Sequence, residues 1–258
     1  MKNNNLKTAV CGAAVFLLGV ILVIFTRSAA IAEGAANSAK VPFALSLILT
    51  LLGFIVLVSP LVPKRRKTDT HTLALAAMFA ALCYIGFSFL RIDIPVGTEK
   101  TAFHLGNVFC VLGALFLGGF WGGMAGAVGM TIADLTTGYI TSAPKTFLLK
   151  LGIGLIAGLV AHRVFHISAA KEDRKCNLTL ATVLSCVAGM AFNVVADPVV
   201  GYFYKTYVLG VPQDAAKIWA KIGAVTTLVN AVVAVIAATV LYLALRPALK
   251  RSHALQIG

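Results

Sequence analysis

The sequence predicts an all-helical (all-α) integral membrane protein, and composition, hydropathy and the spacing of apolar runs carry that prediction. Hydrophobic residues make up 59% of the 258 positions, charged residues make up 12%, and the mean hydropathy is +0.92. A soluble domain has roughly twice that share of charged residues. The apolar residues also gather into runs of about the 20 residues that cross a bilayer. Together these features exclude an ordinary water-soluble enzyme, a disordered chain and a disulfide scaffold.

Eight transmembrane helices are expected from the apolar runs, taken in chain order. They cover residues 8–25, 41–62, 72–90, 103–117, 120–140, 147–165, 178–200 and 218–245. The fourth is short, and Gly118 and Gly119 separate it from the fifth. The eighth is long enough to tilt in the bilayer or to continue beyond it.

The first span has two interpretations. Lys2 and Lys7 precede its apolar run, and the small residues Ser28, Ala29 and Ala30 follow it, as in a cleaved signal peptide. The run is longer than the apolar region of most signal peptides, which favours an uncleaved signal anchor.

The positive residues predict the orientation of the chain. More than half of the 22 lysines and arginines fall on one side of an eight-span arrangement. They lie near the N-terminus, in the run 64–67, in the loop after the sixth span and at the C-terminus. Because basic loops stay in the cytoplasm, both termini are expected there. The net charge of +13 is therefore explained by the membrane topology, with membrane lipid as the expected partner and no nucleic acid.

Polar residues inside the predicted spans are candidates for function, because burying them in lipid is costly. They are Asn107, Asp134, Lys150, Asn193, Asp197 and Asn230. All lie in the outer half or near the middle of their spans, whereas the inner halves carry no charge. This distribution predicts a polar pocket open to the outside and closed below by apolar helix, rather than a continuous pore.

Two of these residues invite a specific pairing. Asp134 lies more than a turn inside its span, and Lys150 is its natural partner by sign and depth. The alternatives are a purely structural salt bridge and a Lys150 side chain that extends outward to water. Asn193 and Asp197 share one helix face, and Asp197 alternatively sits at a helix end in contact with water.

Residues near the outer surface could complete the pocket. Tyr139 and Tyr202 are candidates to stack on a flat ligand, although most aromatics at this level form an interfacial belt. His104 lies at the mouth. The irregular segment 91–101 is expected to be either a lid or an ordinary solvated connection.

Small residues at intervals of four predict close helix contacts. One series runs from Gly118 to Gly129, and it fits packing within the chain. A second comprises Ala76 with Ala80 and Ala77 with Ala81, which fits either internal packing or a partner protein.

No catalytic, metal-binding or cofactor-binding signature appears in the sequence. The five cysteines form no CxxC motif, and no nucleotide-binding motif is present. Transport against a gradient would then draw its energy from another subunit or from an ion.

Several segments resemble one known family. They are FHLGN at 103–107, LGGFWG at 117–122, ADLTTGY at 133–139 and APKTF at 143–147, followed by Lys150. In these the chain resembles the substrate-binding S component of energy-coupling factor (ECF) transporters, in the branch that contains riboflavin transporters. The resemblance covers about residues 70–248 and is most specific in the fourth to sixth spans.

The resemblance implies a six-helix core over residues 68–250. The helix pair expected within residues 1–67 is extra to that core and departs from the family pattern. It implies a bacterial plasma-membrane protein that captures a vitamin from outside beneath a lid between the first two core helices. Riboflavin is the first expectation, and pyridoxine or hydroxymethylpyrimidine ligands are the alternatives. The expected ligand contacts are Asn107, Asp134, Tyr139, Lys150, Asn193 and Asn230.

The resemblance also implies protein partners. An AxxxA pattern on the first core helix docks onto the transmembrane coupling subunit EcfT, which sits on two ABC-type ATPases. Ala76, Ala77, Ala80 and Ala81 occupy that place. The alternatives are a solitary ion-coupled transporter, a membrane enzyme that uses Asp134 and Lys150, and a membrane anchor without a ligand.

Overall fold

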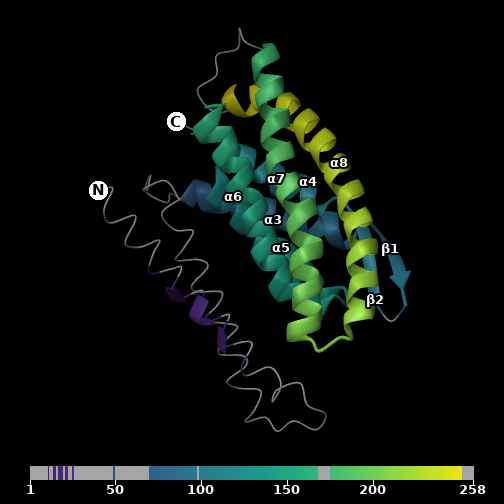
Figure 1. Cartoon of the computed structure of the whole chain (residues 1–258). Helices are drawn as coiled ribbons and strands as arrows, with labels where there is room; N and C mark the ends of the chain where they lie inside the picture. Colours follow the sequence, from purple (N-terminus) through teal and green to yellow (C-terminus); the bar gives the residue numbers. More distant parts are fainter. Residues whose placement is uncertain are drawn as a thin grey trace. The chain divides into compact units, whose positions relative to one another are not determined.

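The computed structural model describes residues 70–97, 99–167 and 175–251, together with a few single residues between 11 and 49. The predicted spans 8–25 and 41–62 lie outside these ranges, so the helix pair expected there stays a prediction. The described elements are α3 (Thr70–Ser88), β1 (Arg91–Val96), β2 (Glu99–His104), α4 (Gly106–Leu117), α5 (Gly119–Thr136), η2 (Ile140–Ser142), α6 (Ala143–Leu159), η3 (Val160–Val164), α7 (Lys175–Phe203), η5 (Tyr204–Val208) and α8 (Gln213–Arg251) (Figure 1).

The chain divides into two compact units. One comprises residues 68–201 and 218–258, and it contains every residue of the candidate site. The other includes residues 202–217, where the π-helix η5 continues α7 and the Phe203 and Tyr207 rings stack with centroids 5.8 Å apart.

The helices confirm the predicted all-helical membrane fold. Four of them are long and apolar enough to cross a bilayer, namely those over Thr70–Ser88, Ile140–Val164, Leu178–Val208 and Gln213–Leu249. Helix α4 is apolar but shorter. It ends where Gly118 takes a φ of +83°, a conformation that disfavours side chains, and α5 begins at the next residue.

Helix α5 contacts α3, α4 and α6, and glycines bring these backbones together. A Cβ atom on Gly122 would collide with Ala114 of α4, and one on Gly154 of α6 would collide with Gly123 of α5. One on Gly129 would collide with the carbonyl group of Ala80 on α3. The glycine series therefore packs helices of this chain against one another, as expected.

Helices α7 and α8 join this group through buried side chains. The Phe116 ring of α4 lies 4.8 Å from the Tyr242 ring of α8, measured between centroids. The Thr239 hydroxyl of α8 donates to the Cys186 sulfur of α7 over 3.7 Å. Met190 of α7 is also buried, so the core continues along the length of these helices.

A β-hairpin is the main departure from the sequence prediction. The segment expected to be irregular, together with the expected start of the fourth span at Phe103, forms the antiparallel pair β1–β2. Gly97 makes the turn with a φ of +63°. A two-stranded hairpin is marginally stable alone, so contacts with the helices must hold it in place. At its base, the Leu105 amide donates to Gly86 O (3.1 Å) and Leu90 O (3.2 Å).

Candidate functional site

The six residues expected to contact a ligand are all buried, with at most 9% of each exposed. They come from five helices and from the connection between α5 and η2. They are Asn107 (α4), Asp134 (α5), Tyr139 (the connection), Lys150 (α6), Asn193 (α7) and Asn230 (α8).

Three of these residues have buried acceptor oxygens without a hydrogen-bond donor. The oxygens are Asn107 Oδ1, Asp134 Oδ2 and Asn193 Oδ1. Leaving a polar atom buried and unpaired costs about 1–3 kcal/mol. Three such atoms on three helices are therefore available to accept hydrogen bonds from water or from a ligand.

Asp134 and Lys150 do not form the expected ion pair. The hydrogen-bonding neighbour of the Asp134 carboxyl is Thr146, and Lys150 interacts with it only through a longer-range electrostatic attraction. Lys150 interacts more strongly with Asp197, whereas its own backbone carbonyl accepts a hydrogen bond from Cys110 Sγ over 3.6 Å.

The ion pair at this level is instead formed by Lys145 and Asp197. Lys145 Nζ lies 2.7 Å from Asp197 Oδ1, and the Thr227 hydroxyl donates to Asp197 Oδ2 over 2.8 Å. Both carboxylate oxygens are thus used, and they connect α6, α7 and α8. Asp197 therefore links three helices, and its side chain stays 24% exposed.

His104 lies at the inner face of β2 as a neutral group. Its ring packs on Phe87 with centroids 4.7 Å apart. Burial lowers the pKa of His104 to about 3; the positive charge of Lys150 adds to this effect, whereas Asp197 opposes it. Since Nδ1 has no partner, His104 adds one more buried polar atom beside the site.

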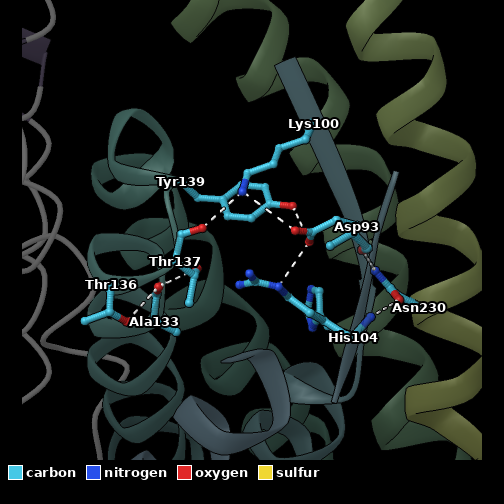
Figure 2. A network of polar contacts seen from close by, with 10 residues as sticks. Asp93, Lys100, His104, Ala133, Thr136, Thr137, Tyr139 and Asn230 are labelled. Atoms are coloured by element: carbon cyan, nitrogen blue, oxygen red, sulfur yellow. Dashed lines mark hydrogen bonds and ion pairs between the residues drawn. The ribbon is translucent and has the colours of Figure 1, made fainter. Parts of the chain in front are cut away.

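Tyr139 connects the helices to the hairpin (Figure 2). Its hydroxyl donates to Asp93 Oδ1 of β1 over 2.9 Å. Lys100 Nζ of β2 lies 4.5 Å from the centre of the Tyr139 ring and donates to Thr137 O over 3.1 Å. Burial raises the pKa of the Tyr139 hydroxyl, and the hydrogen bond to Asp93 raises it further. The hydroxyl therefore stays protonated and acts as a donor.

Asn230 holds the other side of the hairpin (Figure 2). Its Nδ2 donates to Ala102 O over 3.0 Å, and its Oδ1 accepts from the His104 amide over 3.0 Å. One residue of a parallel third strand would make the same pair of bonds. The structure thus gives Asn230 a role in positioning β2.

A comparison with protein families identifies the chain. The family model described as ECF-type riboflavin transporter, S component, matches residues 67–247. The chain belongs to this family. Neither the comparison with curated proteins nor that with solved structures gives a significant match.

Family membership makes this S component a multi-pass membrane protein and a vitamin-type substrate-capture subunit that works with an ECF module. The family is one of transporter components rather than enzymes. Among the residues that the structure describes, no three His, Cys, Asp or Glu side chains are grouped to hold a metal ion.

The structure separates the two alanine pairs of this S component. Ala76 is buried, and the carbonyl group of its partner Ala80 packs against Gly129 of α5. Ala77 and Ala81 lie on the exposed face of α3. Only the second pair is available on the surface of the described chain.

Sequence reasoning missed Asp93, Lys100 and the pairing of Lys145. A signal for the first two was present, because RIDIPV alternates polar and apolar residues over Ile92 and Ile94. That alternation is typical of a strand with one face toward the protein. No comparable signal pairs Lys145 with Asp197, since the two are 52 positions apart on different helices.

Proposed function

We propose that this S component captures riboflavin from outside the cell for an ECF-type ABC importer. The observation that carries the proposal is the set of unpaired acceptors Asn107 Oδ1, Asp134 Oδ2 and Asn193 Oδ1. Riboflavin offers hydroxyl and N–H donors that suit these atoms, and the family description names it. Pyridoxine and hydroxymethylpyrimidine are the alternative ligands within the same function.

The charge around the site favours a neutral ligand. Two cations, Lys145 and Lys150, lie near two anions, Asp134 and Asp197, and all four interact electrostatically. A phosphorylated ligand would bring negative charge into a balanced group and would have to be desolvated there. In this proposal Lys150 donates to a ligand acceptor, whereas Tyr139 and Asn230 act at its margin through the hairpin.

Transport requires partners, which we propose to be the EcfT coupling subunit and two ABC-type ATPases. The exposed Ala77 and Ala81 on α3 would form the contact with EcfT, because small residues allow close helix approach in membranes. The chain would lie in a bacterial plasma membrane with both termini in the cytoplasm, where its basic segments belong.

The proposal is tested by titrating the purified full chain with riboflavin and following flavin fluorescence. Asp134→Asn keeps the size of the side chain and removes its charge. It is expected to weaken binding at least 10-fold, because a hydrogen bond to a charged group contributes about 1.5–3 kcal/mol. Asp214→Asn is the matched control, since the Asp214 side chain is 96% exposed. Equal affinity of the two variants would contradict the assignment of Asp134.

A second candidate is a solitary ion-coupled carrier, which the buried Asp134 favours because intramembrane carboxylates are common in proton and ion relays. Vitamin uptake by a host strain with and without the coupling module distinguishes the two. Uptake that continues at full rate without the module would favour the solitary carrier.

A further inference from the structure

The β1–β2 hairpin turns its charged face toward the helices. Residues directly opposite one another in an antiparallel pair share a face. The pairs Arg91–His104, Asp93–Ala102 and Pro95–Lys100 therefore place Arg91, Asp93, Lys100 and His104 together. Ile92 points the other way, and it is 70% exposed. The hairpin is thus attached to the protein by polar contacts as well as by the buried Ala102, which belongs to the hydrophobic core.

Asp93 is the centre of these contacts. Arg91 Nε lies 3.1 Å from Asp93 Oδ1, and Lys100 Nζ lies 3.7 Å from Asp93 Oδ2. Both cations belong to the hairpin itself. The third contact, from the Tyr139 hydroxyl, comes from the connection between α5 and η2. Asp93 therefore orients the hairpin cations and also binds the hairpin to the helices.

Lys100 makes the second attachment to the same connection. Its Nζ donates to Thr137 O over 3.1 Å, and a Cβ on Gly138 would lie 3.4 Å from this nitrogen. We call two hydrogen bonds the latch: the one from Tyr139 to Asp93 and the one from Lys100 to Thr137 O. They lie across the hairpin from Asn230, so the hairpin is held on two sides (Figure 2).

The surroundings of Tyr139 argue against its use as a stacking surface for a ligand. Lys100 Nζ lies 4.5 Å from the ring centre and the Arg91 guanidinium carbon lies 5.6 Å from it. Phe87 packs against the ring edge-on, with centroids 5.6 Å apart. The hydroxyl is used by Asp93.

We propose that Asp93 is a positioning residue that holds the β1–β2 hairpin closed through Tyr139 and Lys100, and so sets how slowly a bound ligand leaves. Tyr139 then acts through Asp93 rather than on the ligand. The second half of this inference rests on the proposed function, whereas the attachment of the hairpin does not.

The attachment is tested by amide hydrogen exchange on the ligand-free full chain. In Asp93→Asn and in Tyr139→Phe, amides of residues 91–97 other than Pro95 are expected to exchange about 5- to 10-fold faster. The first change removes the charge that strengthens the hydrogen bond between the two side chains, and the second removes the bond itself. The His104 amide, which Asn230 holds, should change least. The effects of the two changes should add up to less than their sum in the double variant, since both act on the contact between the Tyr139 hydroxyl and residue 93.

Asp214→Asn serves as the control for removing a negative charge. Tyr139→Phe keeps the aromatic ring and its contacts with the cations, so it tests the hydroxyl even if Asp93→Asn does not fold. Unchanged exchange in Tyr139→Phe would overturn the latch.

The effect on the ligand is tested by stopped-flow release of riboflavin. Both variants are expected to raise the dissociation rate constant about 5- to 10-fold and to change the association rate constant little. If exchange rises while dissociation does not, the latch holds the hairpin but does not control release, and that half of the inference fails. If the wild-type chain binds no riboflavin, the proposed function fails, and the exchange measurement still decides the latch.

Discussion

Asp134 and Asp197 carry the same charge inside membrane helices, yet their partners differ. Asp197 uses one oxygen for Lys145 and the other for Thr227, so each oxygen has a partner. Asp134 has one oxygen with no donor. Because an unpaired buried acceptor is costly, Asp134 is the carboxylate that is suited to a ligand, whereas Asp197 connects helices.

The sequence predicts similar depths for Asp134 and Lys150, but it does not predict the direction in which each side chain faces. Lys145 and Lys150 lie on the same helix, five residues apart, which is about 140° around its axis. They therefore face different neighbours although both are lysines near the outer end. The sign of its charge and its predicted depth made Lys150 the expected partner of Asp134. The actual partner depends on the direction in which each lysine leaves the helix, and that direction depends on how α6 packs against α5 and α7.

His104 provides a pH-dependent prediction at this scale. Its pKa is lowered to about 3 from an ordinary 6.5 by burial, with Lys150 and Arg91 adding to the effect and Asp197 opposing it. The unfolded chain therefore binds a proton that the folded chain does not. Stability is full above pH 6.5 and falls as the pH drops toward 3.

The measurement is thermal unfolding of the detergent-solubilised protein at pH 7.5 and pH 4.5. His104→Gln cannot take up this proton. The midpoint temperature of its unfolding should therefore fall less between pH 7.5 and pH 4.5 than that of the wild type. Equal falls would show that His104 is not the group responsible.

At the scale of elements, the hairpin was missed because two signals conflicted. Ile92, Ile94 and Val96 alternate with polar residues, which favours a strand. Pro95 argues against a strand, because proline is uncommon inside strands. Phe103 begins an apolar run that resembles the start of a membrane span. The hairpin is held by tertiary contacts with Asn230 and Tyr139. Those contacts cannot be predicted from the local sequence pattern.

The helices were easier to predict because hydropathy alone determines where a chain can cross a bilayer. The break at Gly118 was also visible, since only glycine readily takes its φ of +83°. Which glycine meets which backbone required the structure, because it depends on the crossing of α5 with α6.

Close packing of these helices predicts an asymmetry between two glycines. Gly154→Ala would place a methyl group against the backbone of Gly123, whereas a Cβ on Gly223 of α8 meets nothing within 4 Å. Gly154→Ala should therefore destabilise the protein by about 1–3 kcal/mol. Gly223→Ala should leave stability unchanged or raise it by up to about 1 kcal/mol.

Chemical unfolding of both variants in the same detergent gives the comparison. A Gly154→Ala protein as stable as Gly223→Ala would mean that α5 and α6 do not approach each other as closely as described.

At the scale of the whole molecule, the proposed docking face and the proposed ligand contacts lie in different places. Ala77 and Ala81 are on the surface of α3, whereas the candidate ligand contacts are buried. The sequence predicted both alanine pairs as equivalent, because periodicity places them on adjacent faces. Burial of Ala76 distinguishes them.

Ala81→Leu is expected to reduce recovery of the coupling module with the tagged S component at least 10-fold, because a larger side chain prevents close helix approach. Riboflavin affinity of the isolated chain should stay unchanged. Ala191→Leu on the exposed face of α7 is the matched control. Loss of recovery in both variants would point to a general effect of added bulk rather than to a docking face.

The glycine contacts have a consequence for permeability. Where Gly122 meets Ala114, and Gly123 meets Gly154, backbone touches backbone and leaves no space for a file of water molecules. Protons and small ions cross proteins along such files or along chains of polar side chains. The seams among α4, α5 and α6 are therefore insulating at these contacts.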